Sequence, residues 1–221
     1  MSVSKIEQSR AQQTEQTATQ HESSPSLQVP LGNHDDRHAT GVGTSGRWST
    51  KRIAVYALFV ALAIVASFIE LPIFPAAPFL KYDPSGIIGL VAGFAYGPAA
   101  AVIVSVLGFV PHLFTNPLGA LMNIAIALAL SVPASLLYRN KHTRPGALLG
   151  IICGSVIALI VAILGNLLIT PLYAHMSVAQ VAAMIIPILL PFNVLKFVIH
   201  GVVTFLIYKP ISNVLASTAN K

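Results

Sequence analysis

The chain has 221 residues, of which 55% are hydrophobic and only 9% are charged. A soluble domain carries about 25% charged residues, so this composition excludes an ordinary globular domain and indicates a membrane protein. The formal net charge of +6 comes from dispersed basic residues, which lie outside the apolar runs with the exception of Lys196. That distribution is typical of topology signals rather than of a nucleic-acid-binding surface.

The first 50 residues differ in composition from the rest of the chain. They contain many Gln, Ser, Thr and His residues and few large apolar ones. Such a segment cannot bury enough apolar surface to fold alone, and we expect a disordered cytosolic tail over residues 1–50. Its histidines, His21, His34 and His38, lack a spacing that favours metal binding, so we predict no metal site. We expect a membrane domain over residues 51–212 and a short cytosolic tail over residues 213–221.

Six hydrophobic segments follow the first tail, and most are long enough to cross a bilayer as a helix. They cover approximately residues 53–69, 84–96, 98–114, 117–138, 146–169 and 184–208. The second segment is short for a full span. The sequence therefore predicts an all-α integral membrane protein, a compact bundle of six transmembrane helices.

Basic residues orient these helices. They precede the first segment (Arg47, Lys51, Arg52), separate the fourth from the fifth (Arg139, Lys141, Arg144) and follow the sixth (Lys209). If both termini are cytoplasmic, all three groups lie on the cytoplasmic face, as positive charges do in membrane proteins. Lys81 is then the one basic residue on the outer side, where its neighbour in sequence is Asp83.

The connector between the first two segments, residues 71–83, contains three prolines and several large apolar residues. We expect it to be ordered and non-helical. Asp83 followed by Pro84 is typical of a helix start, with a carboxylate cap and proline in the first turn. For Asp83 this pattern favours capping over direct ligand contact.

Glycines recur at every fourth position in two segments. The two series are Gly89, Gly93 and Gly97, and Gly146, Gly150 and Gly154. In a membrane such small residues let helix backbones approach closely, so both series predict tight helix packing.

Lys196 is the only charged residue in the apolar run 182–208. A lone ammonium at membrane depth costs roughly 2.5–3.5 kcal/mol. Asn193 lies three residues earlier and therefore on the same helical face. We expect a polar pocket here, with a bound ligand rather than a neighbouring side chain satisfying the ammonium.

Further polar and aromatic residues are candidates for the same pocket. Asn166 lies near the outer end of the fifth segment, and Asn123 is a weaker candidate in the fourth. Phe79, Leu80 and Tyr82 can cover the pocket from the outer connector. Amides, one ammonium and aromatic walls suit a neutral, flat molecule with polar edges.

Neither the histidines of the apolar segments nor any sequence motif indicates catalysis. His112 and His200 are better interpreted as hydrogen-bonded core residues than as ligand contacts. The chain has no phosphate-binding GxxxxGK[ST] loop and no HExxH motif, and we predict that it is not an enzyme.

Three stretches resemble the riboflavin-specific substrate-binding subunits (S components) of energy-coupling factor (ECF) vitamin transporters. FPAAPFLKYDPSGIIGLVAGFAYGP (residues 74–98) resembles their first outer loop and second helix. NLLITPLY (residues 166–173) is similar to the end of their fifth helix, and PFNVLKFVIHGVVTFLIYK (residues 191–209) to their last helix with its Asn-x-x-Lys pair. The resemblance covers residues 51–212. Gly86 departs from it, because the family often has an acidic residue there.

The resemblance implies a six-helix fold that captures riboflavin from the outer face of a prokaryotic plasma membrane, beneath a lid formed by the first outer loop. Riboflavin is the transported ligand, and no cofactor is implied. The implied partners are a transmembrane coupling subunit and two ATPase subunits. The family's Ala-x-x-x-Ala pattern, which faces the coupling subunit, maps to Ala57 and Ala61. Its ligand contacts map to Asn166, Asn193 and Lys196 and to the loop residues Phe79, Leu80 and Asp83.

We therefore predict a high-affinity riboflavin-binding subunit of an ATP-driven importer. One alternative is an S component for another vitamin or for a phosphorylated flavin, but a phosphate would need more than one nearby cation and only Lys81 and Lys196 are candidates. A stand-alone vitamin facilitator is another alternative. It would need a continuous polar path, whereas the inner halves of the segments are apolar.

Overall fold

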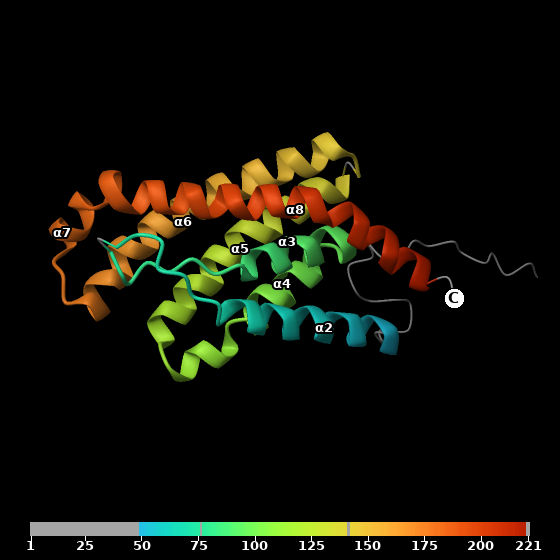
Figure 1. The fold of residues 1–221 in the computed structure, drawn as a ribbon, viewed down its shortest axis with the longest axis horizontal. Coiled ribbons are helices and arrows are strands. Elements are labelled where there is room, and N and C mark those ends of the chain that lie inside the picture. Colours follow the sequence, from blue (N-terminus) through green and yellow to red (C-terminus); the bar gives the residue numbers. More distant parts are fainter. Residues whose placement is uncertain (1–48, 76, 141, 220–221) are drawn as a thin grey trace, which may run out of the picture. The chain divides into compact units, whose positions relative to one another are not determined.

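The computed structural model describes residues 49–75, 77–140 and 142–219. Arg47, Lys141 and nearly all of the tail expected over residues 1–50 lie outside the described residues. Within these ranges the fold is helical (Figure 1), and the one β-type contact is an isolated antiparallel bridge between Leu71 and Tyr82. The α-helices are α2 (Thr50–Ser67), α3 (Ser85–Tyr96), α4 (Pro98–Leu107), α5 (Pro117–Asn140), α6 (Arg144–Ala174), α7 (Val178–Ala183) and α8 (Leu190–Ala219).

The described residues thus form seven α-helices rather than the expected six. Each of the six predicted segments contains one of them, and the additional helix is the short α7. Ser177 and Gln180 form a capping box that stabilises the start of α7, a local signal in the connector before the last segment. A π-helical turn, η2 (Ile185–Leu189), then leads into α8.

The described helices differ in their ability to span a bilayer. Four stretches are long and apolar enough: Thr50–Ser67, Pro117–Asn140, Arg144–Ala174 and Ile185–Pro210. The shorter apolar elements are α3 and the pair formed by α4 and the 3₁₀ turn η1 (Val110–Phe114). Gly97 separates α3 from α4 with a φ of 86°, a conformation that favours glycine, and Pro98 opens α4.

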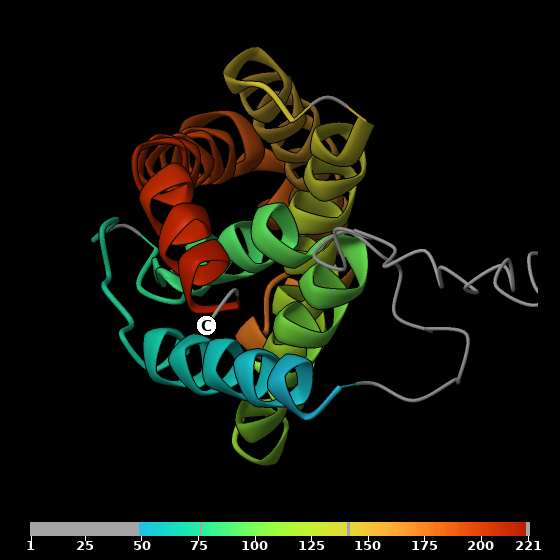
Figure 2. The same ribbon diagram turned by 90° about the vertical axis from the view of Figure 1, so that its right-hand side faces the viewer.

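The glycine series pack helices closely, as predicted. A Cβ atom added at Gly150 would lie 2.6 Å from the Ala134 carbonyl oxygen of α5, and one at Gly93 would lie 2.9 Å from the Ser135 Cβ. The backbone of α6 therefore lies directly against that of α5. The helix α3 packs against α2, α4, α5 and α8 and occupies the centre of the bundle (Figure 2).

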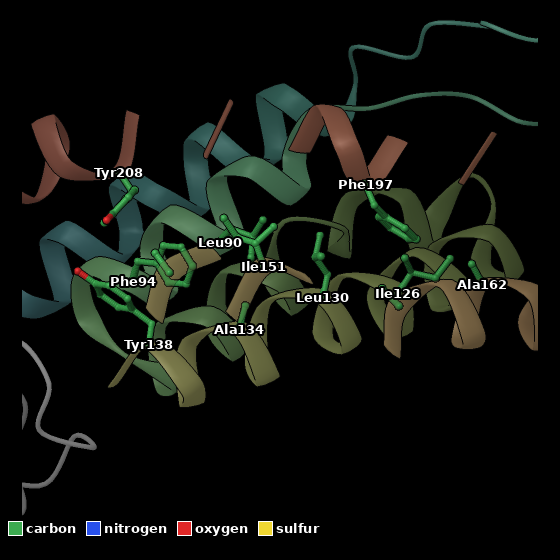
Figure 3. Close-up of a cluster of buried hydrophobic side chains, with 12 residues drawn as sticks. Leu90, Phe94, Ile126, Leu130, Ala134, Tyr138, Ile151, Ala162, Phe197 and Tyr208 are labelled. Carbon is green, nitrogen blue, oxygen red and sulfur yellow. The ribbon is translucent and has the colours of Figure 1, made fainter. Parts of the chain in front are cut away.

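Large apolar side chains from α3, α5, α6 and α8 meet in one buried cluster (Figure 3). At one end of this cluster three aromatic rings interlock: the Phe94 and Tyr138 ring centroids are 4.7 Å apart, and the Tyr138 and Tyr208 centroids 5.7 Å apart. This end of the bundle is filled by side chains. The opposite end, beneath the connector 71–83 and the start of α8, contains the polar residues.

Candidate ligand-binding site

A cavity of about 270 Å³ lies where α5, α6 and α8 meet the connector 71–83. Its volume is close to the lower end of the roughly 300–1,000 Å³ that small-molecule sites occupy. Six of the seven predicted ligand-binding residues line it, together with the weaker candidate Asn123. These six are Phe79, Leu80, Asp83, Asn166, Asn193 and Lys196.

Lys196 is buried, and its Nζ donates a hydrogen bond of 2.8 Å to Oδ2 of Asp83. The two residues form an ion pair with side-chain exposures of only 9% and 7%. The expectation that a ligand rather than a neighbouring side chain satisfies the ammonium is therefore wrong. The partner lies 113 residues away in sequence, so no local pattern could reveal it. Because both charges are desolvated, the stability of the pair depends on both partners being present.

Asp83 also stabilises the start of α3, although the N-cap is Pro84 and the helix begins at Ser85, one residue later than the sequence context predicted. Its Oδ1 accepts hydrogen bonds from the Ser85 backbone N–H, at 3.2 Å, and from the Ser85 hydroxyl. Burial alone raises the pKa of the Asp83 carboxyl, but the Lys196 ammonium and these hydrogen bonds lower it more, so the pKa lies below its ordinary value. Asp83 is therefore a fixed carboxylate at the base of the connector.

His200 forms a hydrogen bond with the backbone of Asp83. Its Nε2 lies 2.9 Å from the Asp83 carbonyl oxygen, in agreement with the interpretation of His200 as a hydrogen-bonded core residue. The Tyr82 ring centroid lies 5.4 Å from that of His200. Tyr82 is not among the described residues that line the cavity, so the prediction that it covers the pocket is wrong. A Cβ at Gly86 would lie 2.6 Å from His200 Nδ1, so any side chain at this position would require the His200 ring to move.

Each of the two asparagines is oriented by a backbone carbonyl four residues earlier in the chain. Asn166 Nδ2 donates to the Ala162 carbonyl oxygen at 2.7 Å, and its Oδ1 accepts from the Thr170 hydroxyl at 2.9 Å. Asn193 Nδ2 donates to the Leu189 carbonyl oxygen at 2.8 Å. An amide nitrogen carries two N–H groups, so each asparagine has a further donor for a ligand.

A second ion pair lies at the rim of the cavity. Lys81 pairs with Glu70, three residues after the end of α2, rather than with Asp83, its neighbour in sequence. Both side chains are partly exposed. With Asp83–Lys196 at the bottom and Glu70–Lys81 at the rim, the two cations and two carboxylates that line the cavity are paired with each other.

Apolar and aromatic residues that the sequence did not single out complete the wall. They include Phe109, Met122, Tyr173 and Phe192. Residues 119, 122, 123 and 126 of α5 all line the cavity, and this i, i+3, i+4, i+7 spacing is the signal that could have identified that face. His112 lines the cavity as well, while its Nε2 lies 2.9 Å from the Ser67 hydroxyl. His112 therefore forms a hydrogen bond within the protein, as expected. Its position in the cavity wall also allows it to contact a ligand.

The described residues thus form a helical bundle with four stretches apolar and long enough to cross a membrane and a cavity of small-molecule size at one end. Residues 51–208 match the family described as "ECF transporter, substrate-specific component", and the chain belongs to that family.

Relatives and a solved structure agree with this assignment. The chain is 29% identical over 174 residues to the riboflavin transporter RibU of Staphylococcus aureus, covering 75% of this chain and 92% of that protein. It is 27% identical over 181 residues to RibU of Streptococcus thermophilus, covering 76% and 85%. It is 24% identical over 172 residues to the riboflavin transporter FmnP of Bacillus subtilis, covering 72% and 90%. A solved S component of a bacterial ECF transporter superposes with a TM-score of 0.65 at 28% identity, covering 75% of this chain and 97% of that one.

Proposed function

We propose that this chain is the high-affinity riboflavin-binding subunit of an ATP-driven ECF importer and that it captures the vitamin from the outer face. The observation that carries the proposal is the cavity in which Asn166, Asn193 and Lys196 converge from α6 and α8 beneath Phe79 and Leu80. The riboflavin transporters among its relatives support the choice of vitamin.

The chemistry of the cavity suits riboflavin, which has a flat ring with carbonyl and ring-nitrogen acceptors and a hydroxylated chain. The asparagines can donate and accept, and the Lys196 ammonium has N–H groups beyond the one that it gives to Asp83. A hydrogen bond to a neutral group is worth about 1 kcal/mol net, and one to a charged group about 1.5–3 kcal/mol. Because Asp83 already balances Lys196, a bound ligand need not bring a negative charge, which favours a neutral vitamin.

A phosphorylated flavin has less support. A phosphate monoester carries about −1.5 to −2 charges at neutral pH and requires cationic partners. Both lysines of the described cavity wall are engaged by carboxylates. A facilitator has less support as well, since α8 continues from Lys196 into the packed aromatic cluster around Tyr208.

We further propose six membrane spans with both termini in the cytoplasm of a prokaryotic cell. The start of α2, the start of α6 and the second half of α8 lie towards the same end of the bundle, opposite the connector 71–83 (Figure 1). These stretches contain Arg52, Arg144 and Lys209. Basic residues at one face agree with a cytoplasmic location of that end. The cavity then opens towards the outside.

Ala57 and Ala61 are both exposed on α2, and we propose that this face docks the coupling subunit, which acts with two ATPases. Changing both to leucine should leave riboflavin binding by the isolated subunit intact and abolish riboflavin uptake by cells. Uptake at the original rate would show that the coupling subunit docks elsewhere.

Titration of the purified subunit with riboflavin, followed by quenching of flavin fluorescence, tests the proposed ligand. We expect saturable binding with one flavin per chain, and a yellow preparation if the vitamin is retained. Riboflavin 5′-phosphate and an unrelated vitamin are the comparison ligands. If riboflavin leaves the signal unchanged while a comparison ligand binds, the proposed cargo is wrong.

A further inference from the structure

A second hollow lies on the outside of the bundle, between α6 and α8 and apart from the ligand cavity. It is a groove of about 420 Å³ with almost entirely aliphatic and aromatic walls. On α6 it extends from Leu148 to Leu159, and on α8 from Val194 to Leu206. Eleven helical steps of about 1.5 Å make it roughly 16 Å long, which suits an extended hydrocarbon chain.

The walls of this groove face outward. Ile152 is 53% exposed, Val202 53% and Leu206 67%. In a membrane protein such a face meets the hydrocarbon of the bilayer. The helices touch at the bottom of the groove, where a Cβ at Gly201 would lie only 2.7 Å from the Ile151 Cγ2. The absence of a side chain at Gly201 thus lets α8 approach α6 closely beneath the groove.

Two basic residues lie at one end of the groove. Arg144 is one turn before Leu148 on α6, and Lys209 is three residues after Leu206 on α8. Both are exposed, and neither has an ion-pair partner within the described part of the chain. The acids in that part, Glu70 and Asp83, are engaged at the ligand cavity. Among the described residues, the groove thus joins an apolar channel to positive charge that no carboxylate pairs.

We propose that this groove binds an anionic phospholipid, with one acyl chain along α6 and α8 and the headgroup phosphate at Arg144 and Lys209. The apolar walls match the acyl chain, and the two cations match the phosphate, whose negative charge no ammonium group of the headgroup offsets in an anionic lipid. A zwitterionic lipid fills the same walls but gains less from the cations. The site does not depend on which vitamin the protein carries.

Tryptophan quenching by brominated phospholipids in vesicles tests this site on the full chain. Trp48 is the single tryptophan and is changed to Phe, and Val202→Trp then reports from the groove. Leu62→Trp, on the exposed face of α2, is the matched reporter at a surface without the groove. The measured quantity is the binding of brominated phosphatidylglycerol relative to phosphatidylcholine. We expect this ratio to be about fivefold higher at position 202 than at position 62.

Removing the cations should remove this preference. In the Arg144→Gln/Lys209→Gln variant, the two lipids should quench the Val202→Trp signal equally, whereas Arg144→Lys/Lys209→Arg should keep the preference. Near-ultraviolet circular dichroism and elution as a single species show that each variant is folded. A preference that survives loss of both cations, or equal quenching in the parent, overturns the proposal. Quenching at position 62 but none at position 202 also overturns it, because protein, such as a second copy of the chain, would then cover the groove.

Discussion

The two halves of α8 have different surroundings although they belong to one continuous helix. In the first half, Asn193, Lys196 and His200 are buried beside the ligand cavity and the base of the connector. In the second half, Tyr208 packs against Phe94 and Tyr138 in a cluster of rings. One helix therefore supplies both a wall of the binding site and part of the packed core. The first half should govern affinity for the ligand and, through its buried ion pair, also stability, whereas the second half and its neighbours should affect stability alone.

The largest effect should follow from breaking the ion pair of the first half. Lys196→Met leaves Asp83 buried without its partner, so we expect a loss of about 3–5 kcal/mol in the free energy of unfolding. Riboflavin affinity should fall by about tenfold or more, because a charged hydrogen bond is lost. Thermal unfolding in detergent and flavin titration measure the two effects.

Asp83→Asn combined with Lys196→Met is the control for this prediction. The double variant removes both charges and should recover much of the lost stability without recovering affinity. A double variant that is no more stable than Lys196→Met would show that the two residues are not energetically coupled.

A change in the packed region should affect stability and spare binding. Gly150→Ala places a methyl group 2.6 Å from the Ala134 carbonyl oxygen, so α5 and α6 must separate, at a cost of about 1–3 kcal/mol. Gly165→Ala on the same helix is the matched control, because its nearest neighbour would lie at an ordinary 3.4 Å. Equal unfolding temperatures for the two variants would contradict the close approach of these helices.

Truncating an amide of the cavity should reduce affinity more moderately. Asn193→Ala removes one uncharged hydrogen-bonding group, and we expect riboflavin to bind about fivefold more weakly, equivalent to about 1 kcal/mol. Leu195→Ala alters the same helix on a partly exposed face outside the cavity and should leave affinity unchanged. If both variants bind equally well, Asn193 does not contact the vitamin.

The smallest effect is expected at the rim. Glu70→Gln releases Lys81, which can then attract a phosphate. Since exposed ion pairs are worth about 0.2–1 kcal/mol, the affinity for riboflavin 5′-phosphate should rise by up to about fivefold while that for riboflavin changes little. Competition between the two flavins measures the ratio, and Lys81→Met should not raise it. A ratio unaffected by Glu70→Gln would mean that the phosphate does not reach the rim.

The sequence predicted the helical segments well because their signals are local. Apolar runs marked each segment, and Asp83–Pro84 marked the start of α3. The short α7 was missed, although Ser177 and Gln180 have the spacing of a capping box, because six residues are too few to show a helical repeat. Candidate site residues were predictable where one polar side chain interrupted an apolar helix, as at Asn166 and Lys196. The aromatic wall residues Phe109 and Phe192 resemble any core residue in sequence and gave no such signal.

Amino-acid order alone thus established a helical membrane protein with a costly ammonium in its last helix, because hydropathy and helical periodicity act over a few residues. The pairings of charges followed from the way the connector folds back over α8. That folding pairs Asp83 with Lys196, which is 113 positions away in sequence. It pairs Lys81 with Glu70, which is 11 positions away. Electrostatic attraction depends on distance in space rather than in sequence, and so the partner of the buried ammonium emerged only when the helices were packed together.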